Sequence, residues 1–175
     1  MDKKKINISL IGMPGAGKTT IAKLLAAQLS LEFIDSDHLI EKINNQSIQD
    51  ILDSEGHAEL RLKEEEVILS CSLNNTILAT GGSAVYSDKA MSYLNNHSMV
   101  IYLDIPISSV MQRVGDYSNR GFAEPSGKSP EDVFNQRTVL YKKWCHLTID
   151  GTFDVDTVAK NIIKAVLNNS LYEQI

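Results

Sequence analysis

Short apolar runs alternate along the chain with longer stretches in which apolar residues return every three or four positions. The short runs predict strands at residues 6–11, 33–34, 76–80, 99–103 and 147–149. The longer stretches predict helices at residues 18–29, 46–73, 107–114, 130–143 and 155–167. Gly56 divides the 46–73 helix into two pieces. Strands that alternate with helices indicate an α/β fold, in which helices cover both faces of a mostly parallel sheet.

Residues 115–129 interrupt this alternation, because they show no apolar period and are rich in Gly, Ser, Asn and Pro. A loop of that length inside a compact domain is usually functional, often a lid. Arg120 within it favours a lid over the alternative, an ordinary solvent-exposed loop. The whole chain, residues 1–175, suits one domain with a full hydrophobic core.

Composition argues against several classes of function. A net charge of −5 argues against a surface that binds nucleic acid or anionic membrane. No apolar stretch approaches the length of a membrane span. The two cysteines, Cys71 and Cys145, are too few for a disulfide framework or a metal site. We expect a cytoplasmic protein that acts as a monomer on small molecules.

A P-loop pattern, G-x-x-x-x-G-K-[ST], is matched in full by residues 12–19. Its glycines allow successive backbone N–H groups to point at phosphate oxygens, and the following helix adds its positive end. Lys18 is expected to reach the β- and γ-phosphates, and the Thr19 hydroxyl to bind Mg²⁺. We therefore expect ATP to contact Gly12, Gly15, Ala16, Gly17, Lys18, Thr19 and Thr20.

Two carboxylates, Asp35 and Asp37, follow the second predicted strand. Alternate residues of an extended chain point the same way, so both could face one site. There they could hold Mg²⁺ through water and accept a hydrogen bond from a substrate hydroxyl. The alternative is that Asp37 is a helix N-cap, which would explain one aspartate but not the pair.

At this point the residues resemble the shikimate kinase family, and the match extends over nearly the whole chain. It rests on the P-loop, residues 33–37 and 80–82, Gly56, Arg61, Glu64, Arg120, Arg137 and Tyr141. The resemblance implies a nucleoside-monophosphate-kinase-like fold with three αβα layers and a central five-stranded parallel sheet. It also implies a substrate-binding helical region at about 35–65 and a mobile lid at about 115–129. The implied reaction moves the γ-phosphoryl group of ATP, with Mg²⁺, to the 3-hydroxyl of shikimate, a step toward the aromatic amino acids.

The resemblance gives catalytic roles to three residues, Lys18, Asp37 and Arg120. By this likeness Asp37 binds the shikimate hydroxyls and is the candidate base at the 3-hydroxyl, while Arg120 meets the transferring phosphoryl group and binds ATP. Asp35 joins Thr19 in placing Mg²⁺.

The remaining implied contacts concern the acceptor and the adenine. Arg61 and Arg137 hold the acceptor's carboxylate, Gly81 and Gly82 let the backbone approach the substrate, and Arg113 lies on adenine. Composition supports these assignments independently, because the chain has thirteen lysines but only four arginines, all at positions with an implied role. Arginine is suited to such sites by its planar, bidentate and stacking geometry.

The chain departs from the usual family pattern at His57, Leu60, Ser83 and Gly121. These changes reshape the pocket wall and loosen the lid. A kinase of the same fold for gluconate or a hydroxy amino acid is therefore an alternative, and a non-catalytic nucleotide-binding regulator is a second. His57 is either structural or a polar pocket residue. Glu64 either orients Arg61 or belongs to a solvated face.

Overall fold

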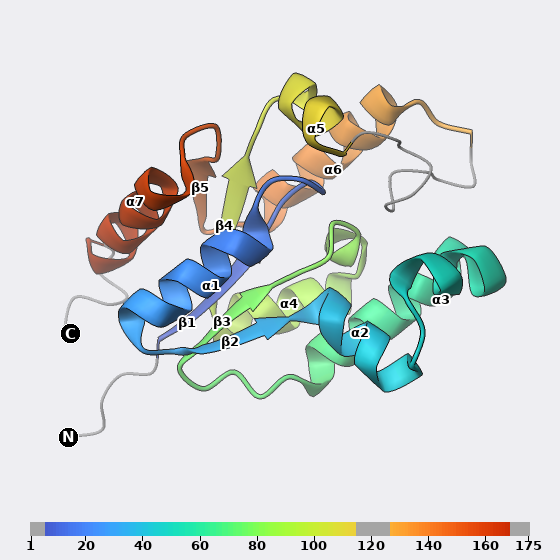
Figure 1. The fold of residues 1–175 in the computed structure, drawn as a ribbon, viewed down its shortest axis with the longest axis horizontal. Helices are drawn as coiled ribbons and strands as arrows, with labels where there is room; N and C mark the ends of the chain where they lie inside the picture. The colour runs from blue at the N-terminus through green and yellow to red at the C-terminus, as the bar shows by residue number, and fades with distance from the viewer. Residues whose placement is uncertain (1–5, 115–126, 169–175) are drawn as a thin grey trace.

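A parallel β-sheet forms the middle of three layers in the computed structural model, which describes residues 6–114 and 127–168 (Figure 1). Over these residues the sheet has five strands in the order β2-β3-β1-β4-β5, and every pairing is parallel. The strands are β1 (Asn7–Ile11), β2 (Glu32–Asp35), β3 (Thr76–Ala79), β4 (Met99–Asp104) and β5 (Leu147–Asp150). The expected five-stranded parallel sheet is confirmed.

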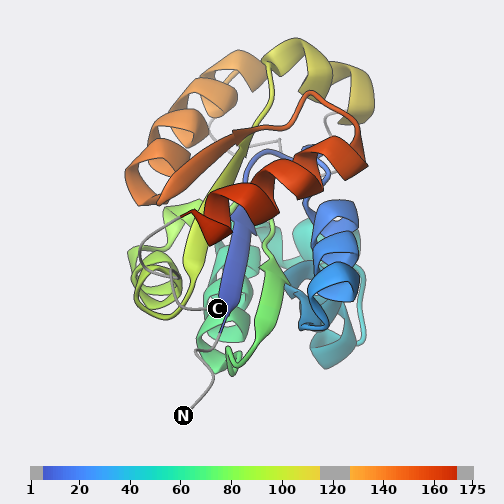
Figure 2. The same cartoon turned by 90° about the vertical axis from the view of Figure 1, so that its left-hand side faces the viewer.

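Helices cover both faces of this sheet, as Figures 1 and 2 show. On one face, α1 (Lys18–Leu29) packs against β1, β2 and β3 and against α7 (Val155–Leu167). On the other face, α4 (Asp88–His97) and α6 (Pro130–Trp144) pack against β4, and α3 (Ile48–Ser70) packs against α4. The shorter elements are α2 (Ser36–Asn44), the 3₁₀ helix η1 (Ala84–Tyr86) and α5 (Ile107–Val114). The expected αβα layering is confirmed.

The core lies along the central strands. All five residues of β1 and all four of β3 are buried, and β1 pairs with both β3 and β4. Strands covered on both faces are rich in buried apolar residues, which explains why these short runs could be identified from the sequence although Asn7, Ser9 and Thr76 lie within them. Gly56, at φ 84° and ψ 177°, interrupts α3 and confirms that this helix has two pieces.

The apolar pattern did not predict two helices, α2 and α4, although the resemblance implied a helical region that contains α2. Helix α4 buries only Ala90, Met91 and Leu94 among serines and asparagines, so its apolar stripe is short. Its best local signal is a cap, since the Ser87 hydroxyl accepts from the Ala90 N–H at 3.0 Å. Helix α2 is short and follows a strand directly, so the sequence offers no intervening turn residues.

The carboxyl ends of parallel strands meet at one edge of the sheet, where ligands bind in open α/β folds. Here that edge carries the P-loop after β1, Asp35 at the end of β2 and Gly81 after β3. None of the described helices combines the length and the apolar character that a membrane span requires.

Candidate active site

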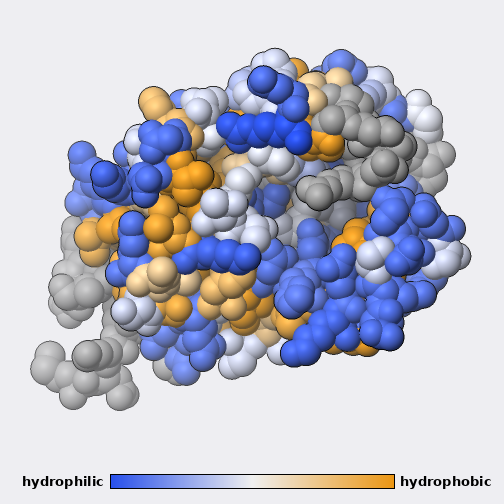
Figure 3. All heavy atoms as spheres, in the orientation of Figure 1, coloured by the Kyte–Doolittle hydropathy of each residue, from blue (hydrophilic) through white to orange (hydrophobic). Residues whose placement is uncertain are grey.

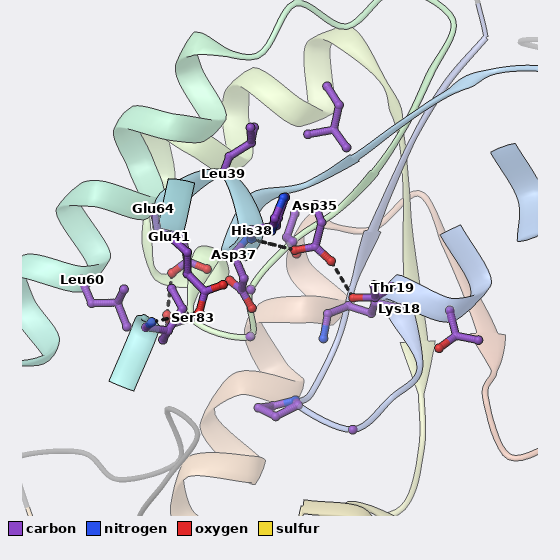
Figure 4. Close-up of a pocket in the computed structure, with 18 of the residues that line it drawn as sticks. Lys18, Thr19, Asp35, Asp37, His38, Leu39, Glu41, Leu60, Glu64 and Ser83 are labelled. Carbon is purple, nitrogen blue, oxygen red and sulfur yellow. Dashed lines mark hydrogen bonds between the residues drawn. The ribbon is translucent and has the colours of Figure 1, made fainter. Parts of the chain in front are cut away.

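A cavity of about 910 Å³ lies at this edge of the sheet. The P-loop and the start of α1 line one end of it, and residues from α2, α3, α6 and the loop after β3 line the other. Hydrophilic side chains gather over α2 and α3 on the face shown in Figure 3. In Figure 4, Lys18, Thr19 and Asp35 lie at one side of the pocket and Asp37, Glu64 and Ser83 at the other.

The P-loop needs glycine at its first position because the chain passes very close to a neighbouring strand. A Cβ on Gly12, where φ is 146°, would lie 2.8 Å from the backbone oxygen of Leu103. The loop then closes on itself, with the Ala16 N–H donating to the Met13 carbonyl at 3.1 Å. Gly17, Lys18, Thr19 and Thr20 follow at the start of α1, where backbone N–H groups have no helical partners.

Lys18 is buried in this loop, with 8% of its surface exposed. Its Nζ donates to the backbone oxygens of Gly12 and Met13, both at 2.8 Å. Burial lowers the pKa of Lys18 to about 8, although the charges of Asp37 and Asp35 oppose this shift. A phosphate beside Lys18 would therefore relieve the cost of burying its charge.

Thr19 and Asp35 meet directly, since the Thr19 hydroxyl donates to Asp35 Oδ2 at 2.7 Å (Figure 4). Asp35 also caps α2 by accepting from the N–H groups of Asp37 at 3.0 Å and His38 at 3.3 Å. The helix N-cap is thus Asp35, and the alternative that placed the cap at Asp37 is wrong. A hydroxyl and a carboxylate side by side are oxygen donors of the kind that Mg²⁺ takes together with water and phosphate oxygens, so they fit this ion.

Asp37 and Glu64 approach each other at the opposite end of the cavity. A Cβ on Gly81 would overlap Glu64 Oε1 and would lie 2.6 Å from Asp37 Oδ1, so both carboxyl groups border this glycine. Glu64 is 2% exposed and accepts from the Ser83 hydroxyl at 2.5 Å, so it is no part of a solvated face. Burial and the charge of Asp37 raise the pKa of Glu64 to about 7, against the opposing hydrogen bond from Ser83.

The structure places three of the four arginines near this cavity. Arg137 is 1% exposed and lines the wall, and a Cβ on Gly82 would lie 3.3 Å from its Nη1. Arg61 does not line the cavity wall and instead packs on Tyr86, which also contacts Arg137. Arg113 donates to the Gly15 oxygen at 3.1 Å, beside the P-loop. The fourth, Arg120, and most of the proposed lid lie outside the described residues.

Two residues that shape the site, Ser36 and Tyr141, were given no role from the sequence, although both belong to the segments that carry the family resemblance. The Ser36 hydroxyl accepts from the Gly81 N–H at 2.9 Å, and the Tyr141 hydroxyl donates to the Gly82 oxygen at 2.7 Å. In each of these hydrogen bonds the donor and the acceptor are more than forty residues apart in the chain. Leu60, one of the departures from the family pattern, lines the cavity, whereas His57 does not.

Comparisons with known proteins agree with this geometry. A family model described as shikimate kinase matches residues 14–167. A shikimate kinase of Francisella tularensis subsp. novicida is 37% identical over 164 residues, covering 91% of this chain and 92% of the relative. One of Clostridium botulinum is 32% identical over 166 residues, covering 94% and 99%. The solved shikimate kinase of Acinetobacter baumannii, in complex with shikimate, superposes with a TM-score of 0.87 at 33% identity and covers 96% of each chain. The chain belongs to the shikimate kinase family.

Proposed function

We propose that this protein transfers the γ-phosphoryl group of ATP to the 3-hydroxyl of shikimate. The observation that supports the proposal most is the single cavity that joins a P-loop to a buried arginine and to the carboxyl groups of Asp37 and Glu64. The solved relative from Acinetobacter baumannii was obtained with shikimate bound, which names the acceptor class that such a cavity takes.

At the phosphate end, the P-loop N–H groups and Lys18 would bind the β- and γ-phosphates, and Arg113 would lie by the adenine. Thr19 and Asp35 would hold Mg²⁺, which offsets phosphate charge when it is bound. Because Lys18 already spans the loop, only its ammonium group has to turn from the carbonyls of Gly12 and Met13 to the nucleotide.

At the acceptor end, Asp37 would accept the proton of the attacking hydroxyl, because it is an exposed carboxylate on the cavity wall. Arg137 and Arg61 would bind the acceptor's carboxylate, and Gly81 and Gly82 would leave room for the substrate. We propose that residues 35–65 form the acceptor-binding region and that residues 115–129 form a lid carrying Arg120 to the phosphoryl group.

A coupled ADP-release assay tests the proposal with shikimate, its carboxamide, gluconate and a hydroxy amino acid as acceptors. Shikimate should be turned over, and the carboxamide should lose roughly two decades in kcat/KM because it leaves a polar site without its partner. Arg61→Lys and Arg137→Lys should each lose roughly tenfold to a hundredfold on shikimate, since lysine cannot form the bidentate pair. Arg113→Lys is the matched control and should keep the preference for the acid.

Equal rates on acid and amide would remove the arginines from acceptor recognition and favour a kinase for a neutral hydroxy compound. Nucleotide binding with no acceptor-dependent ADP release would leave a non-catalytic regulator instead.

A further inference from the structure

The aromatic ring of Tyr86 contacts two arginines that come from different helices. Arg61, on α3, places its Cζ 4.0 Å from the ring centroid, and Arg137, on α6, places its Cζ at 5.4 Å. Arg137 Nε also donates to the Tyr86 hydroxyl at 3.3 Å. Both guanidinium groups are within the range of about 6 Å in which a cation is attracted to an aromatic face.

The position of this ring is set by the loop that forms one wall of the cavity. Tyr86 ends η1, which directly follows Gly81, Gly82 and Ser83, and its N–H donates to the Ser83 oxygen at 3.0 Å. Ala84 and Val85, the other two residues of η1, are each 2% exposed. The backbone that carries the ring is therefore packed into the core, directly after the loop residues that line the cavity.

Two arginines that bind one carboxylate need such a support. Their like charges repel each other, and each long side chain loses rotamer freedom when it is held in one geometry. The Tyr86 ring contacts one guanidinium through its face and the other through its hydroxyl. These contacts offset part of the repulsion between the arginines, and they restrict the rotamers of both side chains before the ligand binds. Fixing groups in their bound geometry in advance raises affinity by reducing the cost of ordering them.

We propose that Tyr86 is a positioning residue that holds Arg61 and Arg137 in register for the acceptor's carboxylate. The inference rests on the proposed function, because it takes an anionic acceptor as given. Tyr86 need not touch the acceptor, and its effect passes through the arginines. It should therefore act on recognition of the carboxylate and leave phosphoryl transfer and ATP binding unaffected.

The test compares Tyr86→Leu, which removes both contacts, with Tyr86→Phe, which keeps the ring and removes only the hydroxyl. Tyr93→Phe is the matched control, because the Tyr93 hydroxyl donates to the Cys71 oxygen at 2.6 Å and Tyr93 is not among the cavity-lining residues. For each variant, kcat and KM are measured with shikimate and with its carboxamide, KM is measured for ATP, and the thermal midpoint reports folding.

Tyr86→Leu should raise the KM for shikimate about tenfold, the scale of a desolvated cation–π contact, with kcat changed by less than about threefold. Turnover of the carboxamide and the KM for ATP should hardly change, so the acid-to-amide ratio of kcat/KM should fall about tenfold. Tyr86→Phe should lower that ratio by roughly threefold, the scale of one modest hydrogen bond. Tyr93→Phe should leave it unchanged.

An unchanged acid-to-amide ratio in folded Tyr86→Leu overturns the inference. If that variant does not fold, Tyr86→Phe decides, and an unchanged ratio in it is equally decisive. The proposed function fails separately, and the inference falls with it, if the wild-type protein turns over a neutral acceptor as well as shikimate. If the wild type prefers the acid and the Tyr86 variants keep the same preference, the proposed function stands and only the role of Tyr86 is refuted.

Discussion

Glu64 gives the molecule a pH dependence that can be measured without any ligand. Its carboxyl is almost fully buried, borders Asp37 across Gly81 and accepts from Ser83. Lys18 and Arg137 are the nearby positive charges that favour its ionised form. Burial and Asp37 outweigh them and raise the pKa of Glu64 from 4.5 to about 7. Between pH 4.5 and about 7, the Glu64 carboxyl of the folded protein therefore keeps a proton that the unfolded chain has released.

The sign of the effect follows from that difference. A folded-state pKa above the unfolded value contributes stability that is fully present below pH 4.5 and is lost as pH rises through about 7. Each tenfold change in proton affinity is worth about 1.4 kcal/mol. The difference between the two pKa values thus sets an upper bound of about 3.5 kcal/mol on the loss, and relaxation of the partners of a buried carboxyl when it ionises makes the loss smaller.

Glu64→Gln isolates this contribution, since glutamine has nearly the shape of the protonated acid and does not ionise. Urea unfolding of both proteins should be measured from pH 4.5 to 8, and the free energies of unfolding subtracted. The variant should match the wild type near pH 4.5 and become progressively more stable than it up to about pH 7. Above that pH the difference should level off.

Glu66→Gln is the matched control, because Glu66 is exposed on the same helix and its loss removes the same charge. Its difference from the wild type should not reproduce the rise seen for Glu64→Gln. A Glu64→Gln difference that stays constant from pH 4.5 to 8 would show that Glu64 ionises as readily as in the unfolded chain. The account of a desolvated carboxyl beside Asp37 would then be wrong.

Three further predictions concern catalysis. Lys18→Ala should abolish ADP release while circular dichroism shows an intact fold, because in the proposed function Lys18 would be the main protein cation at the β/γ-phosphates; near-normal turnover by the folded variant would end the kinase proposal. Gly81→Ala should raise the KM for shikimate at least about tenfold in steady-state assays, because its Cβ would displace the carboxyls of Glu64 and Asp37; an unchanged KM would show that these groups can move aside freely. Arg120→Ala should lower kcat much more than acceptor affinity, as a charge needed mainly in the transition state does, and a loss of affinity alone would make it a binding residue.

Most of the fold could be predicted because its signals are local. The central strands are short, fully buried runs, and α1 and α7 begin and end where their apolar periods do. Helices α2 and α4 were missed for the corresponding reason, since each presents only a short apolar stripe to the core. Their stability comes from tertiary packing, which a local pattern does not report.

The two ends of the site differ in the same way. The P-loop is one contiguous motif, so its position between β1 and α1 could be predicted from the sequence. The pairing of Arg61 with Arg137 came only through the family resemblance, and the ring that contacts both was not foreseen. Tyr86 is 25 residues from Arg61 and 51 from Arg137, so no pattern of spacing along the chain could bring the three together.

The acceptor end is also where this chain departs from the usual family pattern, and Ser83 shows what such a departure can do. Ser83 occupies the position of the family's third glycine, and a glycine there has no hydroxyl to donate to Glu64. That hydrogen bond favours the ionised carboxyl and opposes the rise in the pKa of Glu64. Removing it should move the titration of Glu64 to higher pH, so the charge beside Asp37 at neutral pH depends on a residue that the phosphate end does not involve. Burial and Asp37 still make the larger contributions, so this departure from the family pattern changes the charge state of the acceptor pocket without setting it alone.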